Sequence, residues 1–152
     1  MAMVIIVPTV DSVEEAQDIL DLLYFPPVGH RTYGPSQAAT MYANVPGGYR
    51  ATFNDNLFVV FMIETILGSS NANNIAALPG VTGLFGATSD LGNFSGFTGG
   101  DVDYDLLIRN AYASAHNHGE YGCTSFAFFG RNVNYAADPP APFQYYFGCF
   151  QN

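Results

Sequence analysis

The sequence contains no lysine and no tryptophan, and its four basic residues are all arginines. The absence of lysine excludes a class of carbonyl chemistry, because a Schiff-base aldolase or a pyridoxal-phosphate enzyme needs a lysine amine as its nucleophile. Any carbonyl chemistry in this chain must therefore be activated by a metal ion or by hydrogen-bond donors.

Charge is also scarce. Only 11% of the residues are charged, and the formal net charge is −9. Nucleic-acid binding needs clustered Lys and Arg, and so does attraction to an anionic membrane surface. No apolar run reaches the roughly 18 residues of a membrane span, and "MAMVIIVPTV" lacks the positive region and cleavage site of a signal peptide. We expect a cytoplasmic protein with neither nucleic acid nor membrane as a partner.

Cysteine is rare as well, with two residues, Cys123 and Cys149, in 152. Two cysteines could form one disulfide, but they do not make a disulfide scaffold in a chain of this length. We expect free thiols. The hydrophobic share of 49% is enough for one domain with a core of its own.

Apolar runs alternate with helical patterns along most of the chain. The expected strands are residues 3–10, 57–64, 81–86 and 122–130. A first helix is expected to be capped by Asp11 or Ser12 and to reach about residue 23, with Ser12 and Glu15 as a capping box. Further helices are expected from about 68 to 78 and from 101 or 103 to about 118. Residues 36–56 read as irregular or weakly helical, and a glycine-rich loop follows residue 86. Strands that are apolar on both faces indicate a parallel α/β fold.

The chain divides at about residue 131. Residues 1–131 carry the alternating pattern, whereas residues 132–152 form a divergent tail rich in aromatic residues and proline. The tail could supply a last strand or a sticky surface.

Two carboxylates follow neighbouring strands at the points where these strands end. Glu64 ends the run "VVFMIE", and Asp90 follows "VTGLFGATS". The carboxyl ends of parallel strands meet at one edge of the sheet, so we expect the two acids to be neighbours. Adjacent carboxylates repel unless they share a proton or a cation. Mg²⁺, which is often bound through one or two carboxylates with water and substrate, fits such a pair.

Several segments together resemble the HpcH/HpaI aldolase/citrate lyase family. The family patterns are "LLVPMV…ADEA", "RYPPxGxRGxG" and "QIET…N…I…PGVDGLFIGPADLS". The matching parts of this sequence are "VIIVPTVDSVEEAQ", "YFPPVGHRTYGP", "MIET" (62–65), Asn71, Ile75, "PGVTGLFG" and "SDLG". The spacing from Glu64 to Asp90, 26 positions, equals that of the family.

This resemblance implies a (β/α)8 TIM barrel, of which this chain would supply a part with about four parallel strands and alternating helices. It implies a lyase or aldolase that depends on Mg²⁺ or Mn²⁺ and acts on the enolate of a small 2-oxo acid such as pyruvate. By the same resemblance, Glu64 and Asp90 would be the metal ligands. The backbone amides of Ser89 and Asp90 would bind the substrate carboxylate.

The sequence also departs from the family pattern. Met62 stands where the family has glutamine, and Thr88 and Ser89 replace proline and alanine. The family's catalytic histidine and its carbonyl-polarising arginine belong to strands before those matched here, so the catalytic residues are unknown. A partial barrel has open edges that invite pairing, and we expect a homo-oligomer. The alternative is a truncated, catalytically inactive half-barrel that acts as a self-associating structural protein.

Each candidate residue also has a structural interpretation. Glu64 could be a strand-end acid near solvent, and Asp90 could cap a short helix. We interpret His30 and Arg31 as residues that pack a loop. His116 and His118 do not share a helical face, and we interpret them as structural.

Overall fold

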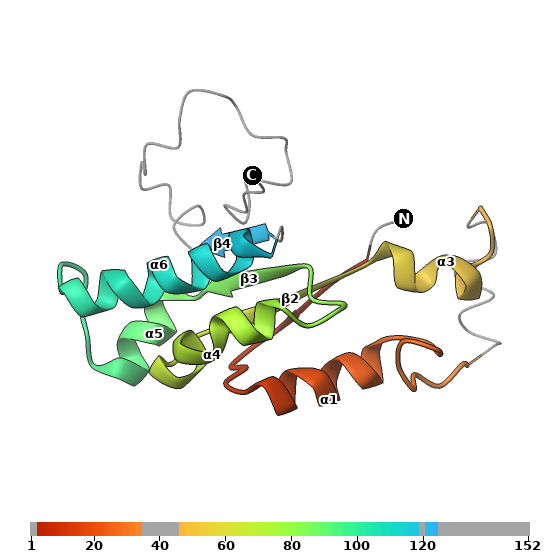
Figure 1. Ribbon diagram of the computed structural model, residues 1–152, viewed down its shortest axis with the longest axis horizontal. Coiled ribbons are helices and arrows are strands. Elements are labelled where there is room, and N and C mark those ends of the chain that lie inside the picture. Colours follow the sequence, from red (N-terminus) through yellow and green to blue (C-terminus); the bar gives the residue numbers. More distant parts are fainter. Residues whose placement is uncertain (1–2, 35–45, 119–120, 125–152) are drawn as a thin grey trace, which may run out of the picture.

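The computed structural model of the protein describes residues 3–34, 46–118 and 121–124. Within these residues, four parallel strands form one sheet in the order β1-β2-β3-β4. In chain order the elements are β1 (Met3–Val7), α1 (Val13–Leu23), α3 (Tyr49–Asn56), β2 (Leu57–Ile63), α4 (Ile66–Ala76), β3 (Gly83–Gly86), α5 (Thr88–Ser95), α6 (Val102–Asn117) and β4 (Tyr121–Thr124). Figure 1 shows α3 at the end of the sheet where β2 begins and α5 at the opposite end. The predicted parallel α/β fold is confirmed.

The strands are shorter than the apolar runs that predict them. β1 ends at Val7 and not at residue 10. Pro8 has no N–H to donate to a sheet, and Thr9 has a positive φ of 52°, outside the β region. β3 begins at Gly83 and not at residue 81. The predicted strand 122–130 begins at Tyr121 as β4, and its part beyond residue 124 lies outside the described residues.

The sheet buries one face more completely than the other, which corrects the expectation of strands buried on both faces. Along β2, buried and half-buried residues alternate. The fully buried set packs with helices α1, α4 and α6 into one core. On the edge strand β1, Val4 and Ile6 are 37% and 39% exposed. The alternation follows because successive side chains of a strand point to opposite faces.

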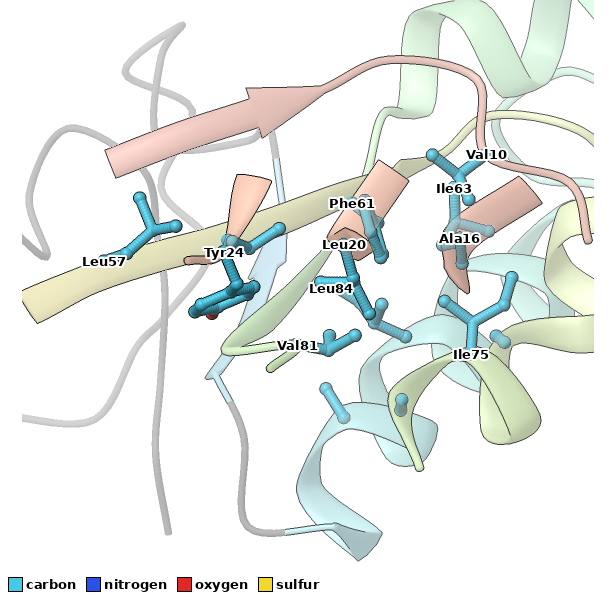
Figure 2. Packing of buried hydrophobic residues seen from close by; sticks show 14 of the residues in the cluster. Val10, Ala16, Leu20, Tyr24, Leu57, Phe61, Ile63, Ile75, Val81 and Leu84 are labelled. Carbon is cyan, nitrogen blue, oxygen red and sulfur yellow. The ribbon is translucent and has the colours of Figure 1, made fainter. Parts of the chain in front are cut away.

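The centre of the core lies between β2, β3 and the helices. Figure 2 shows Phe61 of β2 close to Leu20 of α1 and Leu84 of β3, with Ile63 and Val10 further along. Phe61 and Ile63 are fully buried, and Leu84 is 1% exposed. Non-directional apolar burial of this kind is the dominant favourable contribution to folding.

The helix caps follow the sequence where polar side chains are available. Ser12 caps α1, and its hydroxyl accepts a hydrogen bond from the Glu15 amide at 3.1 Å. The Glu15 carboxylate in turn accepts from the amide of Asp11 at 3.0 Å, one residue before the cap. The capping interaction predicted from Ser12 and Glu15 is therefore present. It differs from a regular capping box in one bond, because the Glu15 carboxylate accepts from the amide of Asp11 and not from that of Ser12.

Two helices occupy segments whose sequence predicts a helix weakly or not at all. α5 stands where a glycine-rich loop is predicted, and α3 lies in the segment predicted to be irregular or weakly helical. Neither has a side-chain hydrogen bond at its N-cap. α3 is anchored by Phe53, which is 4% exposed and packs edge-to-face on Phe25. Packing of this kind outweighs weak local propensity.

The histidines and Arg31 have structural contacts. His30 Nδ1 lies 2.6 Å from Asp21 Oδ1 on the surface, and the Arg31 guanidinium stacks 4.4 Å over the Phe53 ring. His116 stacks on Tyr112 in α6.

Some predictions fall on residues that the structure does not describe. The tail 132–152, with Cys149, lies outside the described residues, so the prediction of free thiols stays a prediction. Among the described residues, no helix is both long and apolar enough to span a bilayer.

Replacing Tyr24 with Phe should lower stability and weaken its alkaline pH dependence. The Tyr24 hydroxyl donates to the Gly80 carbonyl at 2.6 Å, so Tyr24→Phe should cost about 1 kcal/mol near neutral pH. Burial raises the pKa of Tyr24 above 10.0. The fold therefore favours the protonated phenol, a contribution that is complete below the unfolded pKa and lost as pH rises through the folded pKa.

Urea unfolding of both proteins from about pH 8 to about pH 11 measures this effect. Wild-type stability should fall more than that of Tyr24→Phe above about pH 10. If the stability of the two proteins fell equally with rising pH, the raised pKa of Tyr24 would be contradicted.

Candidate functional site

The carboxyl ends of β2 and β3 meet beside the start of α5. Ile63 pairs with Gly86 across the two strands, and the next amide, that of Ala87, donates to the Ile63 carbonyl at 3.2 Å. Glu64 follows Ile63 directly, and Ala87 is the N-cap of α5. The register therefore brings the residue after β2 and the start of α5 to the same edge of the sheet.

Glu64 is a buried carboxylate with its hydrogen bonds on one oxygen. It is 4% exposed. Its Oε2 accepts from the Thr9 amide at 2.6 Å and from the Thr9 hydroxyl at 2.8 Å. Thr9 is exposed and has a left-handed backbone conformation, which costs about 1–3 kcal/mol for a residue other than glycine. The contact spans 55 positions of the sequence.

The residues that follow Glu64 in the chain join the start of α4 to the start of α1. Thr65 caps α4 by accepting from the Gly68 amide at 2.9 Å, and its hydroxyl donates to Asp11 Oδ1 at 2.5 Å. The Asn71 side chain donates to the Asp11 carbonyl at 2.7 Å. A Cβ on Gly68 would lie 2.9 Å from Asp11 Oδ1, so glycine permits this close approach. The starts of α1 and α4 are therefore tied together beside Glu64.

Ser89 and Asp90 lie in the first turn of α5, where both are exposed. Asp90 is not the N-cap, since Ala87 holds that position, so the structural interpretation of Asp90 as a cap is wrong. The amides of Ser89 and Asp90 have no acceptor within the helix, because the first N–H groups of any helix lack one. The Tyr104 hydroxyl donates to the Thr88 carbonyl at 2.5 Å and ties α5 to α6. This helix start is suited to a carboxylate or phosphate.

The donor set fits a hard divalent cation held by few protein ligands. Among the described residues no ion pair involves Glu64, and its Oε1 takes no hydrogen bond from any of them. A buried carboxylate without a basic partner gains from a cation. The described part of the chain has no group of three or more His, Cys, Asp or Glu side chains that could hold a metal. A site that has one or two carboxylates and is completed by water and substrate is typical of Mg²⁺ and unlike zinc.

Sequence reasoning selected Glu64, Ser89 and Asp90 as candidates, whose roles stay a prediction, and it did not select Thr9. One signal was available, because Thr9 is a polar residue directly after the apolar run "VIIVP", at the carboxyl end of a strand. Two arginines of the described chain lie away from this edge of the sheet. Arg31 and Arg50 stack on the aromatic rings of Phe53 and Phe25 beside α3, at the other end of the sheet.

The sequence profile of the HpcH/HpaI aldolase/citrate lyase family matches residues 1–126. The chain belongs to this family. It is 35% identical over 117 residues to a 5-keto-4-deoxy-D-glucarate aldolase of Salmonella arizonae, an alignment that covers 76% of this chain and 45% of that protein. The chain thus spans about half the length of the curated relatives it matches.

Solved structures of the HpcH/HpaI family share the fold. A family protein from Burkholderia cenocepacia superposes with a TM-score of 0.71 and 24% identity, over 80% of this chain and 49% of that one. An HpcH/HpaI aldolase from Desulfitobacterium hafniense gives a TM-score of 0.69 and 23% identity, over 80% and 48%. The fold of this chain is therefore that of part of a TIM-barrel-like aldolase.

Proposed function

We propose that this chain carries the metal and carboxylate-binding half of a divalent-metal-dependent carbon–carbon lyase or aldolase that acts on a small 2-oxo acid. The observation that carries the proposal is the buried Glu64 carboxylate, hydrogen-bonded on Oε2 alone, at the edge where α5 begins. Family membership supports the reaction class.

Each part of the site has a role in this proposal. Glu64 and Asp90 would hold Mg²⁺ or Mn²⁺. The first-turn amides of Ser89 and Asp90 would bind the substrate carboxylate, with the partial positive charge of the helix start adding to the attraction. When bound, the cation supplies Lewis-acid stabilisation of the negative charge that develops on the carbonyl oxygen. The core packing of β2 and β3 would keep the two halves of the site in register.

Among the described residues, Glu64 has no basic side chain as a hydrogen-bond partner. No histidine or arginine of these residues makes an ion pair with Glu64 either, and Arg31 stacks on the Phe53 ring. We therefore propose metal-dependent decarboxylation of oxaloacetate as the reaction to assay. It breaks a carbon–carbon bond and gives CO₂ and the pyruvate enolate, which then takes a proton from water.

Oxaloacetate loss should be followed spectroscopically with Mn²⁺ and again after addition of excess EDTA. Turnover above the rate of free Mn²⁺, proportional to protein and abolished by EDTA, would support the proposal. A rate equal to that of the metal alone would contradict it for this chain.

One observation favours a second candidate, a self-associating structural protein. β1 pairs on one side only within the described residues, and its exposed side chains Val4 and Ile6 are apolar. An edge strand of this kind favours pairing with another chain.

Sedimentation velocity of wild type and Ile6→Lys tests self-association. A dimer or larger species of the wild type should dissociate in the variant, because the substitution places a charge on the exposed apolar surface of β1. A wild-type monomer at all concentrations would exclude self-association.

A further inference from the structure

We propose that Thr9 is a positioning residue for Glu64, which fixes the carboxylate through Oε2 and so presents Oε1 to the cation. This proposal rests on the proposed function, because it takes Glu64 to be a metal ligand. It assigns a role to a residue that lies two positions beyond the end of β1.

The geometry of the contact supports this role. The amide and the hydroxyl of one residue converge on the same carboxylate oxygen, at 2.6 Å and 2.8 Å. Two donors from one residue restrict the position of Oε2 more than a single donor would. Charge-assisted bonds of this kind are roughly twice as strong as neutral ones.

The backbone of Thr9 supports the same conclusion. A β-branched residue at φ 52° is an outlier, because its side chain crowds the backbone in the left-handed region. Such a conformation persists only where the surroundings determine it, and here the Thr9 amide points at Glu64. The next residue is also bonded to β2, because the Val10 amide donates to the Met62 carbonyl at 3.2 Å. The strained residue Thr9 is therefore held on its C-terminal side as well.

The contact between Thr9 and Glu64 joins the carboxyl ends of the adjacent strands β1 and β2. Glu64 follows β2 and Thr9 follows β1, and neighbouring residues of the two strands pair in register from Met3 with Leu57 to Val7 with Phe61. A residue that orients a metal ligand typically changes metal affinity 10- to 100-fold when it is mutated. The hydroxyl, and not the bulk of Thr9, should carry this effect.

The variants that separate hydroxyl from shape are Thr9→Val and Thr9→Ser. Valine keeps the branched shape and the strained amide but removes the hydroxyl, whereas serine keeps the hydroxyl. Thr52→Val is a matched control, because Thr52 lies in α3 at the other end of the sheet and its hydroxyl donates to the carbonyl of the N-cap residue Gly48.

Mn²⁺ affinity should be measured by calorimetry for the four proteins. Thr9→Val should bind Mn²⁺ about tenfold more weakly than wild type, whereas Thr9→Ser should recover most of the affinity and Thr52→Val should match wild type. Equal affinity of Thr9→Val and wild type would overturn the proposal. A loss in Thr9→Ser as large as that in Thr9→Val would also overturn it.

A metal-free measurement keeps this proposal separate from the proposed function. Urea unfolding of wild type, Thr9→Val, Glu64→Ala and the double variant forms a cycle. A double variant that loses less stability than the sum of the two single losses supports the Thr9–Glu64 contact, and additive losses overturn it. Absence of Mn²⁺ binding by wild type would contradict the proposed function, while the cycle would still decide whether Thr9 holds Glu64.

Discussion

Phe61→Ala should lower the free energy of unfolding by about 3–5 kcal/mol. Phe61 is fully buried in β2, between β1 and β3, and packs beside Leu20 and Leu84 (Figure 2). Its removal takes away apolar burial and leaves a cavity, which packed neighbours fill only in part. Domains are stable by about 5–15 kcal/mol, so this single change should remove a large share of the total.

Phe94→Ala is the matched control for this prediction. Phe94 lies in α5 and is 58% exposed, so the same substitution there should change stability by no more than about 0.5 kcal/mol. Urea unfolding followed by circular dichroism measures both variants. Similar losses in the two variants would contradict the position of Phe61 at the centre of the core.

Glu64→Gln should reduce Mn²⁺-dependent oxaloacetate decarboxylation at least about 100-fold, because metal stabilisation of transition-state charge is worth several kcal/mol and each 1.36 kcal/mol is a factor of ten. Glutamine keeps the size of the side chain and an oxygen that can accept from Thr9. It removes the negative charge that a divalent cation requires. The loss should therefore occur without unfolding.

Glu14→Gln removes one negative charge from the exposed first turn of α1 and should leave the rate unchanged. Circular dichroism of both variants checks that the fold is retained. Equal rates in Glu64→Gln and wild type would show that the carboxylate takes no part in the reaction.

The sequence predicted those parts of the fold that depend on local pattern. The apolar run ending at Glu64 became β2 with a difference of one residue, and Ser12 caps α1 as expected. Strand–helix alternation and a strand interior without charge are properties of short segments, so they can be read without the rest of the chain.

The parts that were missed depend on contacts distant in sequence. α5 contains Gly92 and has an alanine at its N-cap, so its local sequence favours a helix only weakly. The hydrogen bond from Tyr104 to Thr88 and the burial of Leu91 hold it in place. Thr9 was missed for the same reason, because its partner lies 55 positions away and its left-handed conformation has no signature in a threonine.

For the candidate site, the sequence predicted that Glu64 and the segment of Ser89 and Asp90 would meet at one edge of the sheet. Strand order and the end of each apolar run suffice for that inference. The pairing of Ile63 with Gly86 shows that the ends of β2 and β3 lie side by side. Their roles as ligands stay a prediction. A carboxylate at a strand end looks the same in sequence whether it caps, pairs or binds a cation.

The most direct test of the metal site is a calorimetric titration of Mn²⁺ into the protein with oxalate present, for wild type and Glu64→Gln. Oxalate chelates the cation as the enolate of pyruvate would and offers a carboxylate to the start of α5. We expect saturable binding to wild type that is lost in Glu64→Gln. Absence of binding to wild type, or equal binding to both proteins, would contradict the assignment of Glu64 as a metal ligand.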